Sequence, residues 1–449
     1  MIPTSTSSSP AGGLGVRIDG RRLLARLEEL AAVGSTGDGG CCRLALTDAD
    51  RDGRDLVVTW MRDLGLEVSV DGVGNVIGTW QVGSGAPVMT GSHIDTVRTG
   101  GRYDGNLGVL AGLEVIESLM SAGCTPPRPL AVGVFTNEEG ARFQPDMLGS
   151  LVYVGGLSLE EALDTNAIDG ARLGDELDRI GYRGTAPCPA APPHAFVELH
   201  IEQGPLLERS EVRLGAVTGV QGISWQEVTI RGQSNHAGTT PMSLRRDPAL
   251  VAARITVFLR DLALEFGGHQ VCTVGKVDLF PNLVNVVPAR AVLTLDVRNT
   301  DEVLLRAAEA RIAEFLDAVA RDENVDISVR GLARFEPVVF DDRVVDLVTA
   351  AARRHGLSTM RLPSGAGHDA QMLARVCPTA MIFTPSVEGI SHNPAEHTAP
   401  DDLVAGADVL LDVMWELART DLEDAGMVTR TGRRSPPWWT QRPNSDRSS

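Results

Sequence analysis

Histidines and acids at the ends of apolar segments are the residues of this sequence best suited to chemistry. His93 and Asp95 stand two positions apart at the end of the segment 86–95, and residues at that spacing lie on one face of a strand. A carboxylate beside a histidine commonly orients an imidazole that binds a metal, although a lone His-x-Asp pair is a weak indication. Asp104 follows in a glycine-containing turn before the helical pattern 107–123. Helix N-capping is an equally good interpretation of Asp104 taken alone.

Further acids and histidines follow similar segments. Glu138 and Glu139 end the apolar segment 129–139. Adjacent acids at such a position are costly to bury without positive charge, and a surface turn is the alternative. His200 has an acid two residues away on either side, so all three side chains would share one face of a strand. His392 follows a late apolar segment, and taken alone it would more often be a core or loop histidine.

Considered together, these residues predict a pair of metal sites. Two groups of histidine and carboxylate ligands that share one acid suit a pair of divalent cations of borderline softness. Such a pair, bridged by a carboxylate and a water, can supply hydroxide at neutral pH and polarise a carbonyl group. Glu138, next to Glu139, is then placed to act as a general base.

Other catalytic chemistries have little support in the sequence. It contains no G-x-S-x-G, no G-x-x-x-x-G-K-[ST] and no H-E-x-x-H motif. The glycines of 72–78 miss the dinucleotide-binding spacing by one residue and fit a turn between strands better. The cysteines have no neighbouring histidine in sequence, although one could lie near them in space.

The charge balance excludes some partners. The 449 residues include 59 Asp and Glu against 41 Lys and Arg, a formal charge of -18. This field argues against nucleic acid and anionic membrane surfaces as main partners. Six cysteines without a C-x-x-C pair indicate reduced thiols in a cytoplasmic protein. We see no signal peptide and no apolar stretch of about 18 residues.

Strand-like and helix-like segments alternate on both sides of a region with a different pattern. The alternation predicts an α/β domain whose site lies at the carboxyl ends of its strands. The region 216–332 instead follows the β-α-β-β-α-β order of a ferredoxin-like unit. The predicted organisation is a disordered N-terminus (1–15), a catalytic domain in two parts (16–215 and 333–420), an inserted α+β domain (216–332) and a disordered tail (430–449).

Eight motifs give the chain a family resemblance. They are GSHIDT (91–96), GGRYDGNLGV (100–109), TNEEGARF (136–143), ELHIEQGP (198–205), GQSNHAGTTPM (232–242), NLVNVVP (282–288), SGAGHDA (364–370) and GISHNPAE (389–396). In this order they resemble the hydantoinase/carbamoylase amidases of the M20 metallopeptidase superfamily, and the resemblance covers about residues 20–418.

The resemblance implies a fold and a set of metal ligands. The fold would be a zinc-aminopeptidase-like catalytic domain with a mixed central sheet, and the inserted domain would be a lid that also forms a homodimer. Two divalent ions per subunit are expected, either Zn²⁺ or Mn²⁺, Co²⁺ or Ni²⁺. By resemblance one ion is held by His93, Asp104 and His200, and the other by the bridging Asp104, Glu139 and His392.

The resemblance also implies catalytic and substrate-binding roles. Glu138 would be the base, Asp95 the partner of His93, and His236 a donor that reaches the neighbouring subunit's site and stabilises an oxyanion. The substrate contacts would be Gln203, His236, Asn282, Arg298, Gly365 and Ala366, with Asn282 and Arg298 on the substrate carboxylate. Without the resemblance, an exposed loop histidine and a surface ion pair are the alternatives for His236 and Arg298.

The expected reaction is hydrolysis of the ureido bond of an N-carbamoyl-L-amino acid to the amino acid, carbon dioxide and ammonia. An allantoate or ureidoglycolate amidohydrolase or a β-ureidopropionase would share the same site. The loop 142–147 departs from the pattern of well-studied members and leaves the substrate open. A non-catalytic dimeric binding protein on the same scaffold is the alternative from another class.

Overall fold

The computed structural model describes residues 14–422, which divide into two compact units. The first unit ends at Gly219 and resumes at Val339, and the second unit is Val220–Val338. The sequence analysis places the limits of the inserted domain at 216 and 332. Apart from Leu14 and Gly15, the two segments predicted to be disordered lie outside the described residues.

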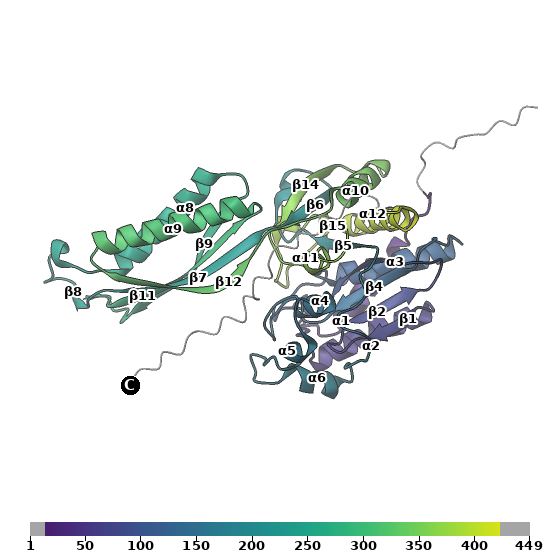
Figure 1. Cartoon of the computed structure of the whole chain (residues 1–449), viewed down its shortest axis with the longest axis horizontal. Coiled ribbons are helices and arrows are strands. Elements are labelled where there is room, and N and C mark those ends of the chain that lie inside the picture. Colours follow the sequence, from purple (N-terminus) through teal and green to yellow (C-terminus); the bar gives the residue numbers. More distant parts are fainter. Residues whose placement is uncertain (1–13, 423–449) are drawn as a thin grey trace, which may run out of the picture. The chain divides into compact units, whose positions relative to one another are not determined.

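The first unit is built on a mixed nine-stranded sheet (Figure 1). Its order is β1-β2-β4-β3-β5-β15-β6-β13, with β14 paired to β6. The central strands β4, β3, β5 and β15 are parallel and buried along their whole length, as expected for strands covered on both faces. The bounds are β1 Glu67–Val70, β2 Val76–Trp80, β3 Val88–His93, β4 Leu130–Phe135, β5 Ala195–Ile201, β6 Leu214–Val220, β13 Val338–Val339, β14 Thr359–Ser364 and β15 Thr379–Thr384.

Helices pack around this sheet, and α3 is the most deeply buried of the longer ones. Its Leu, Val and Ile side chains are almost all inaccessible, and each stabilises the fold by about 1.5–3 kcal/mol. Gly108 lets α3 approach the sheet closely, because a β-carbon there would lie 2.6 Å from the carbonyl oxygen of Leu199. The helices of this unit are α1 Gly20–Ala32, α2 Asp48–Asp63, α3 Asn106–Ser121, α4 Leu148–Tyr153, α5 Leu159–Leu163, α6 Leu173–Ile180, α7 Leu206–Arg209, α10 Asp342–Arg354, α11 Asp369–Leu373 and α12 Pro400–Arg419, with the 3-10 turn η2 at Val387–Gly389.

The second unit is a four-stranded antiparallel sheet with two long helices on one face (Figure 1). Along the chain its main elements are β7 Gly222–Arg231, α8 Pro248–Phe266, β9 Val271–Phe280, β11 Arg290–Asn299, α9 Glu302–Asp322 and β12 Asp326–Phe335. Both helices begin at an aspartate that caps two backbone amides, Asp247 and Asp301. A short pair of strands, β8 Asn235–His236 and β10 Val286–Val287, and the turn η1 Met242–Leu244 complete the unit.

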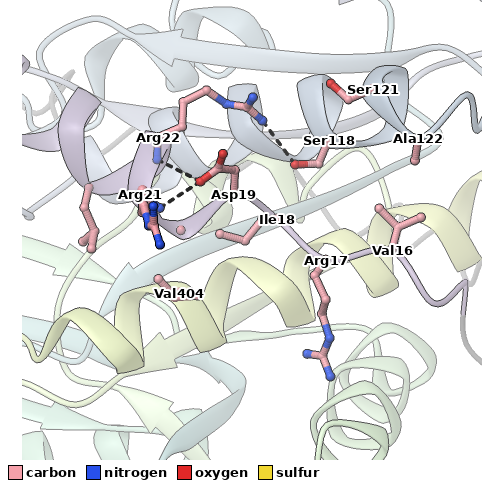
Figure 2. A pocket seen from close by; sticks show the side chains of 12 residues that line it. Val16, Arg17, Ile18, Asp19, Arg21, Arg22, Ser118, Ser121, Ala122 and Val404 are labelled. Atoms are coloured by element: carbon pink, nitrogen blue, oxygen red, sulfur yellow. Dashed lines mark hydrogen bonds between the residues drawn. The ribbon is translucent and has the colours of Figure 1, made fainter.

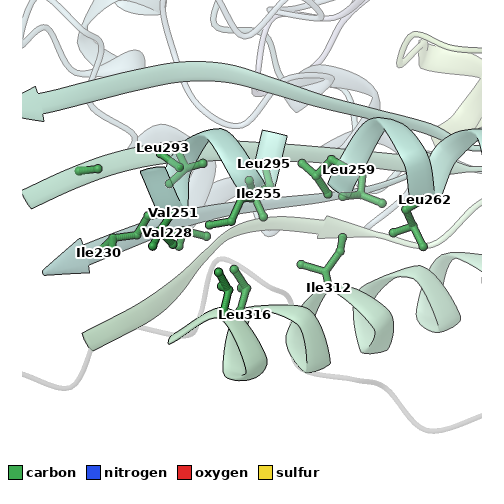
Figure 3. Packing of buried hydrophobic residues seen from close by; sticks show 14 of the residues in the cluster. Val228, Ile230, Val251, Ile255, Leu259, Leu262, Leu293, Leu295, Ile312 and Leu316 are labelled. Carbon is green, nitrogen blue, oxygen red and sulfur yellow. The ribbon is translucent and has the colours of Figure 1, made fainter. Parts of the chain in front are cut away.

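The core of the second unit lies between its helices and its sheet. Figure 3 shows side chains of β7 and β11, such as Val228 and Leu293, gathered with Ile255 of α8 and Ile312 of α9. The predicted mixed α/β fold class is confirmed for the chain. Among the described helices none combines the length and apolar character that a bilayer span requires.

Candidate active site

Asp104 lies at the centre of the candidate site. Its Oδ1 is 3.2 Å from Nε2 of His200 and 3.8 Å from Nε2 of His93. Its Oδ2 is 3.2 Å from Nε2 of His392, and that nitrogen is also 3.2 Å from Oε2 of Glu139. The five predicted ligands therefore meet in two groups that share one carboxylate.

The donor atoms of these two groups fit divalent cations. The ligand atoms of His93, Asp104 and His200 lie within 4.8 Å of one another, as do those of Asp104, Glu139 and His392. Imidazole nitrogens and carboxylate oxygens are the ligands that zinc and related divalent ions take. These residues therefore fit a divalent metal site, in which Asp104 belongs to both donor groups.

The turn before α3 brings Asp104 to the histidines because its next residue is a glycine. Gly105 has φ 67° and ψ -46°, a positive-φ conformation that the absence of a β-carbon permits. A β-carbon there would lie 2.5 Å from the ring of His93. The amide of Gly105 also donates to Nε2 of His200, at 3.2 Å. This glycine allows the backbone to lie directly against both imidazoles.

Backbone carbonyls orient two of the imidazoles. Nδ1 of His93 lies 2.8 Å from the carbonyl oxygen of Asp95, and Nδ1 of His200 lies 2.9 Å from that of Ile201. A carbonyl oxygen only accepts, so each Nδ1 carries a proton and Nε2 of a neutral ring is left as the ligand atom.

The acids give the site a strong preference for positive charge. Burial opposes protonation of His200, but the contact with Asp104 outweighs it and raises the pKa to about 9. Hydrogen bonds to Asp104 and Glu139 raise the pKa of His392 to about 11. Burial opposes ionisation of Asp104, yet His200 and His392 hold its pKa well below the usual range. Cations suit this cluster because its carboxylates are buried together.

The predicted role of Asp95 differs from its observed contacts. Its carboxylate accepts from the amides of Glu138 and Glu139, at 3.2 and 3.3 Å. The nearest carboxylate oxygen is 4.0 Å from Nδ1 of His93, whose closer partner is the Asp95 carbonyl. The role of Asp95 as partner of His93 stays a prediction from the resemblance; Asp95 lies just beyond β3, which ends at His93. Asp95 therefore holds the backbone of the two glutamates.

Glu138 lies beside the ligands and is itself buried. Its Oε2 is 3.4 Å from Nε2 of His93. Burial, together with the charges of Asp369 and Glu139, raises the pKa of Glu138 well above its usual value. A carboxyl group that binds protons more readily than usual is suited to proton transfer near neutral pH.

Gln203 and Glu396 connect the Asp104 turn to the His392 loop. Nε2 of Gln203 donates to Oδ2 of Asp104 at 2.9 Å, so this predicted substrate contact also touches the central acid. Glu396 accepts from the amides of Tyr103 and Asp104, at 3.0 and 3.2 Å, and from Oγ of Ser391 at 2.9 Å. Glu396 is not among the residues predicted from the sequence, although its place at the end of the GISHNPAE motif was a signal for it.

The buried residues His368 and Ser364 contact His200 and the predicted substrate-binding segment Gly365–Ala366. His368 packs against the ring of His200 with centroids 4.6 Å apart, and its Nε2 is 2.8 Å from Oγ of Ser364. That hydroxyl also accepts from the amide of Ala366 at 3.1 Å. His368 therefore links the loop after β14 to a predicted metal ligand.

Arg43 is a second residue that the sequence analysis missed. It is completely buried, and its guanidinium donates to the carbonyl oxygen of Ile94 at 2.7 Å and to Oδ1 of Asn106 at 2.8 Å. Ile94 directly follows His93 at the end of β3, and Asn106 is the first residue of α3, two positions after Asp104. Arg43 therefore links the end of β3 to the start of α3.

The other predicted residues lie on the second unit. His236 is exposed, and its Nδ1 accepts from the amides of Gly238 and Thr239, so its Nε2 carries the proton of the neutral ring. Asn282 lies at φ 54° in an exposed turn. Arg298 donates to Asp296 at 2.9 and 2.8 Å and lies 5.9 Å from the ring centre of Trp225. Contact of these residues with a substrate in the first unit stays a prediction.

A surface cavity of about 750 Å³ lies away from these ligands, between the beginning of α1, the end of α3 and α12. Figure 2 shows Asp19 capping the amides of Arg21 and Arg22, and the Arg22 side chain bonded to Ser118. None of the predicted metal ligands lines this cavity. Its residues show no arrangement for the predicted chemistry.

The mixed sheet and the acid–histidine site are those of a metal-dependent hydrolase. The chain belongs to peptidase family M20/M25/M40, whose model matches residues 89–416. The resemblance inferred from the motifs is thereby confirmed.

Individual relatives are similar over almost their whole length. An N-carbamoyl-L-amino-acid amidohydrolase from Rhizobium meliloti is 41% identical over 91% of this chain and 99% of its own. An allantoate amidohydrolase from Bacillus subtilis is 36% identical over 87% and 96%. The crystal structure of an amidase of the hydantoinase/carbamoylase family from Burkholderia multivorans superposes with a TM-score of 0.88 at 44% identity, covering 91% of this chain and all 100% of that chain.

Proposed function

We propose that this protein is a metal-dependent amidohydrolase that cleaves the ureido bond of an N-carbamoyl-L-amino acid. The observation that carries the proposal is the Asp104 carboxylate, whose two oxygens face two histidine-containing donor groups beside the buried Glu138. The relative from Rhizobium meliloti supports the substrate class.

The residues have defined tasks in this reaction. Divalent ions bound at the five ligands lower the pKa of water and polarise a carbonyl group. Glu138 accepts a proton from the attacking water, whose oxygen bonds to the carbamoyl carbon. The bond from that carbon to the amino-acid nitrogen then breaks, and Glu138 returns the proton to that nitrogen. The products are the amino acid and carbamate, which decomposes to carbon dioxide and ammonia.

The second unit would supply substrate recognition. Asn282 and Arg298 select a free carboxylate, for which a guanidinium fork is well suited. The Nε2 proton of His236 is available for an oxyanion, and loss of such a donor typically costs about 2.7–4 kcal/mol of transition-state stabilisation. Gln203, Gly365 and Ala366 provide the remaining contacts.

We further propose two ions per subunit and a homodimer formed through the second unit, in which His236 serves the partner's site. Zn²⁺, Mn²⁺, Co²⁺ and Ni²⁺ all suit the ligands. Exposed apolar side chains at Phe280, Leu283 and Val284 support an interface on this unit. Light scattering after gel filtration should give twice the chain mass of 47.8 kDa. Six free cysteines are consistent with the expected cytoplasmic location.

An ammonia-release screen tests the reaction and its nearest alternatives. Substrates are N-carbamoyl-L-amino acids, N-carbamoyl-β-alanine, allantoate and ureidoglycolate, each with added Mn²⁺. The relative from Bacillus subtilis favours allantoate as the second candidate. Release from allantoate alone would select that candidate, and release from none would refute the ureido reaction.

A Glu138→Gln variant tests the base. It should retain its metal and lose turnover by about 10²–10⁴-fold, the usual contribution of a general acid–base group. Glu29→Gln, an exposed change on α1, is the matched control and should behave as wild type. Substantial turnover by Glu138→Gln would refute the role of Glu138.

A further inference from the structure

Asn137 occupies an unusual backbone position directly before the two glutamates. It is completely buried and has φ 57°, in the left-handed region that side chains other than glycine rarely adopt. Asparagine tolerates this region better than most residues. The conformation turns the chain at the end of β4, so that Glu138 and Glu139 leave the direction of the strand.

The side chain of Asn137 fills the loop that follows the glutamates. Its Nδ2 donates to the carbonyl oxygens of Phe143 and Pro145, at 2.9 and 3.2 Å. Its Oδ1 accepts from the amide of Phe143 at 3.3 Å. One buried amide group therefore makes three hydrogen bonds across the loop.

The same loop is closed at its base by the backbone of Glu138. The amide of Met147 donates to the carbonyl oxygen of Glu138 at 2.7 Å, and that of Leu148 donates to the carbonyl oxygen of Asn137 at 3.3 Å. The Asp95 carboxylate holds the Glu138 and Glu139 amides. The two acids are thus fixed by Asp95 through their amides and by the Asn137 loop through the Glu138 carbonyl.

Met147 extends this linkage to the loop predicted to bind substrate. A β-carbon added at Gly367 would lie 3.0 Å from the methyl carbon of Met147, so the methionine packs directly against that glycine. Gly367 follows the predicted Gly365–Ala366 contact. The segment 142–147, which the sequence analysis singled out, therefore lies between the glutamates and this loop.

We infer that Asn137 is the positioning residue that aims Glu138 and Glu139 into the site. The expected effect of Asn137 on turnover rests on the proposed function. Its expected effect on metal binding rests only on the geometry of the ligands. Asn137 acts through its loop bonds and its left-handed backbone, and it has no contact of its own with the reacting atoms.

The variant Asn137→Gly separates the side chain from the backbone conformation. Glycine accepts φ 57° without strain but removes all three loop bonds. We expect kcat to fall about 100-fold, the cost of misplacing a catalytic group by about 1 Å, with KM little changed. Zn²⁺ affinity, measured by chelator competition, should fall about 10–100-fold, as for other residues that orient ligands.

The matched control is Asn324→Gly, an exposed asparagine with φ 50° on the second unit. It should leave kcat and zinc affinity at wild-type values. Values for Asn137→Gly within about twofold of wild type, or a loss that the control shares, would overturn the inference.

Two further arms keep the test decisive. If Asn137→Gly does not fold, the isosteric variant Asn137→Asp is tested by the same measurements of kcat, KM and zinc affinity. This variant keeps the acceptor oxygen but, when ionised, cannot donate to the two carbonyl oxygens. If the wild-type protein releases no ammonia from any ureido substrate, the proposed function fails. The zinc affinities of the two glycine variants then still decide the role of Asn137.

Discussion

Gly105→Ala is the sharpest test of how the site is assembled. Gly105 has φ 67°, and a β-carbon there would lie 2.5 Å from the His93 ring atoms Cε1 and Nε2. Real β-carbons essentially never approach other atoms so closely, so the ring of His93 or the Asp104 turn has to move. The substitution adds one methyl group and no charge.

The same helix offers a control glycine with a matching φ. Gly123, just beyond the other end of α3, has φ 68°, and a β-carbon there would meet nothing within 4 Å. A positive φ disfavours alanine at both positions, and at Gly105 the ψ of -46° lies outside the left-handed helical basin and adds strain. The unfolded-state effect of replacing glycine is also common to both variants. The difference in unfolding free energy between the variants therefore reports the clash with His93 together with the backbone strain specific to Gly105, and the zinc affinity reports the displacement of His93.

The clash should cost about 1–3 kcal/mol in the free energy of unfolding, the usual cost of overpacking a buried site. Urea denaturation of both variants measures this difference. Zinc affinity by chelator competition should fall for Gly105→Ala only, because only that variant displaces a ligand. Equal losses of stability in the two variants, with unchanged zinc binding in both, would refute the proposed contact between the turn and His93.

Three other perturbations test separate parts of the site. Removing metal with a chelator should abolish ammonia release and lower the midpoint of thermal unfolding, because an ion at 100 times its Kd stabilises a folded protein by about 2.7 kcal/mol. Adding Mn²⁺ should restore both the activity and the midpoint. A midpoint that the chelator leaves unchanged would contradict the metal site. Glu396→Gln loses acceptor capacity between the Asp104 turn and Ser391, so zinc affinity should fall about 10–100-fold, and wild-type affinity would show that this link is dispensable. Arg43→Met removes the guanidinium donor of the buried Ile94 carbonyl oxygen, while those of Leu30 and Val33 keep a second donor. The urea-unfolding free energy should therefore fall by about 1–3 kcal/mol, and an unchanged value would contradict the role of Arg43.

Periodicity in the sequence predicts the elements that carry the ligands, since it depends only on neighbouring residues. The buried strands β3, β4 and β5 are continuous apolar segments, and His93, Glu138 and His200 lie at or just past their carboxyl ends. Parallel strands bring such ends to one edge of a sheet, so the meeting of these residues follows from the pattern.

Contacts between distant segments could not be predicted in this way. Glu396 bonds to the Asp104 turn and Arg43 to Asn106, across separations of 292 and 63 residues. Glu396 stands in the GISHNPAE motif and Arg43 in none of the motifs, but the sequence identifies the partner of neither residue. The contact of the Asp95 carboxylate with the amides of Glu138 and Glu139 likewise has no signal in the sequence.

Residues with positive φ explain why sequence patterns do not predict the detailed geometry of this site. Asn137, Gln203 and His392 have φ of 57°, 57° and 54°, and Gly105 has 67°. A residue other than glycine in such a conformation costs on the order of 1–3 kcal/mol and persists only where its surroundings hold it. The holding contacts differ in range: Asn137 bonds to carbonyl oxygens of its own loop, whereas Gln203 and His392 are held beside Asp104, which lies far away in the sequence. The strands bring the chain to the site, but the turns after them aim the functional groups, and the turns at Gln203 and His392 depend on contacts between distant segments.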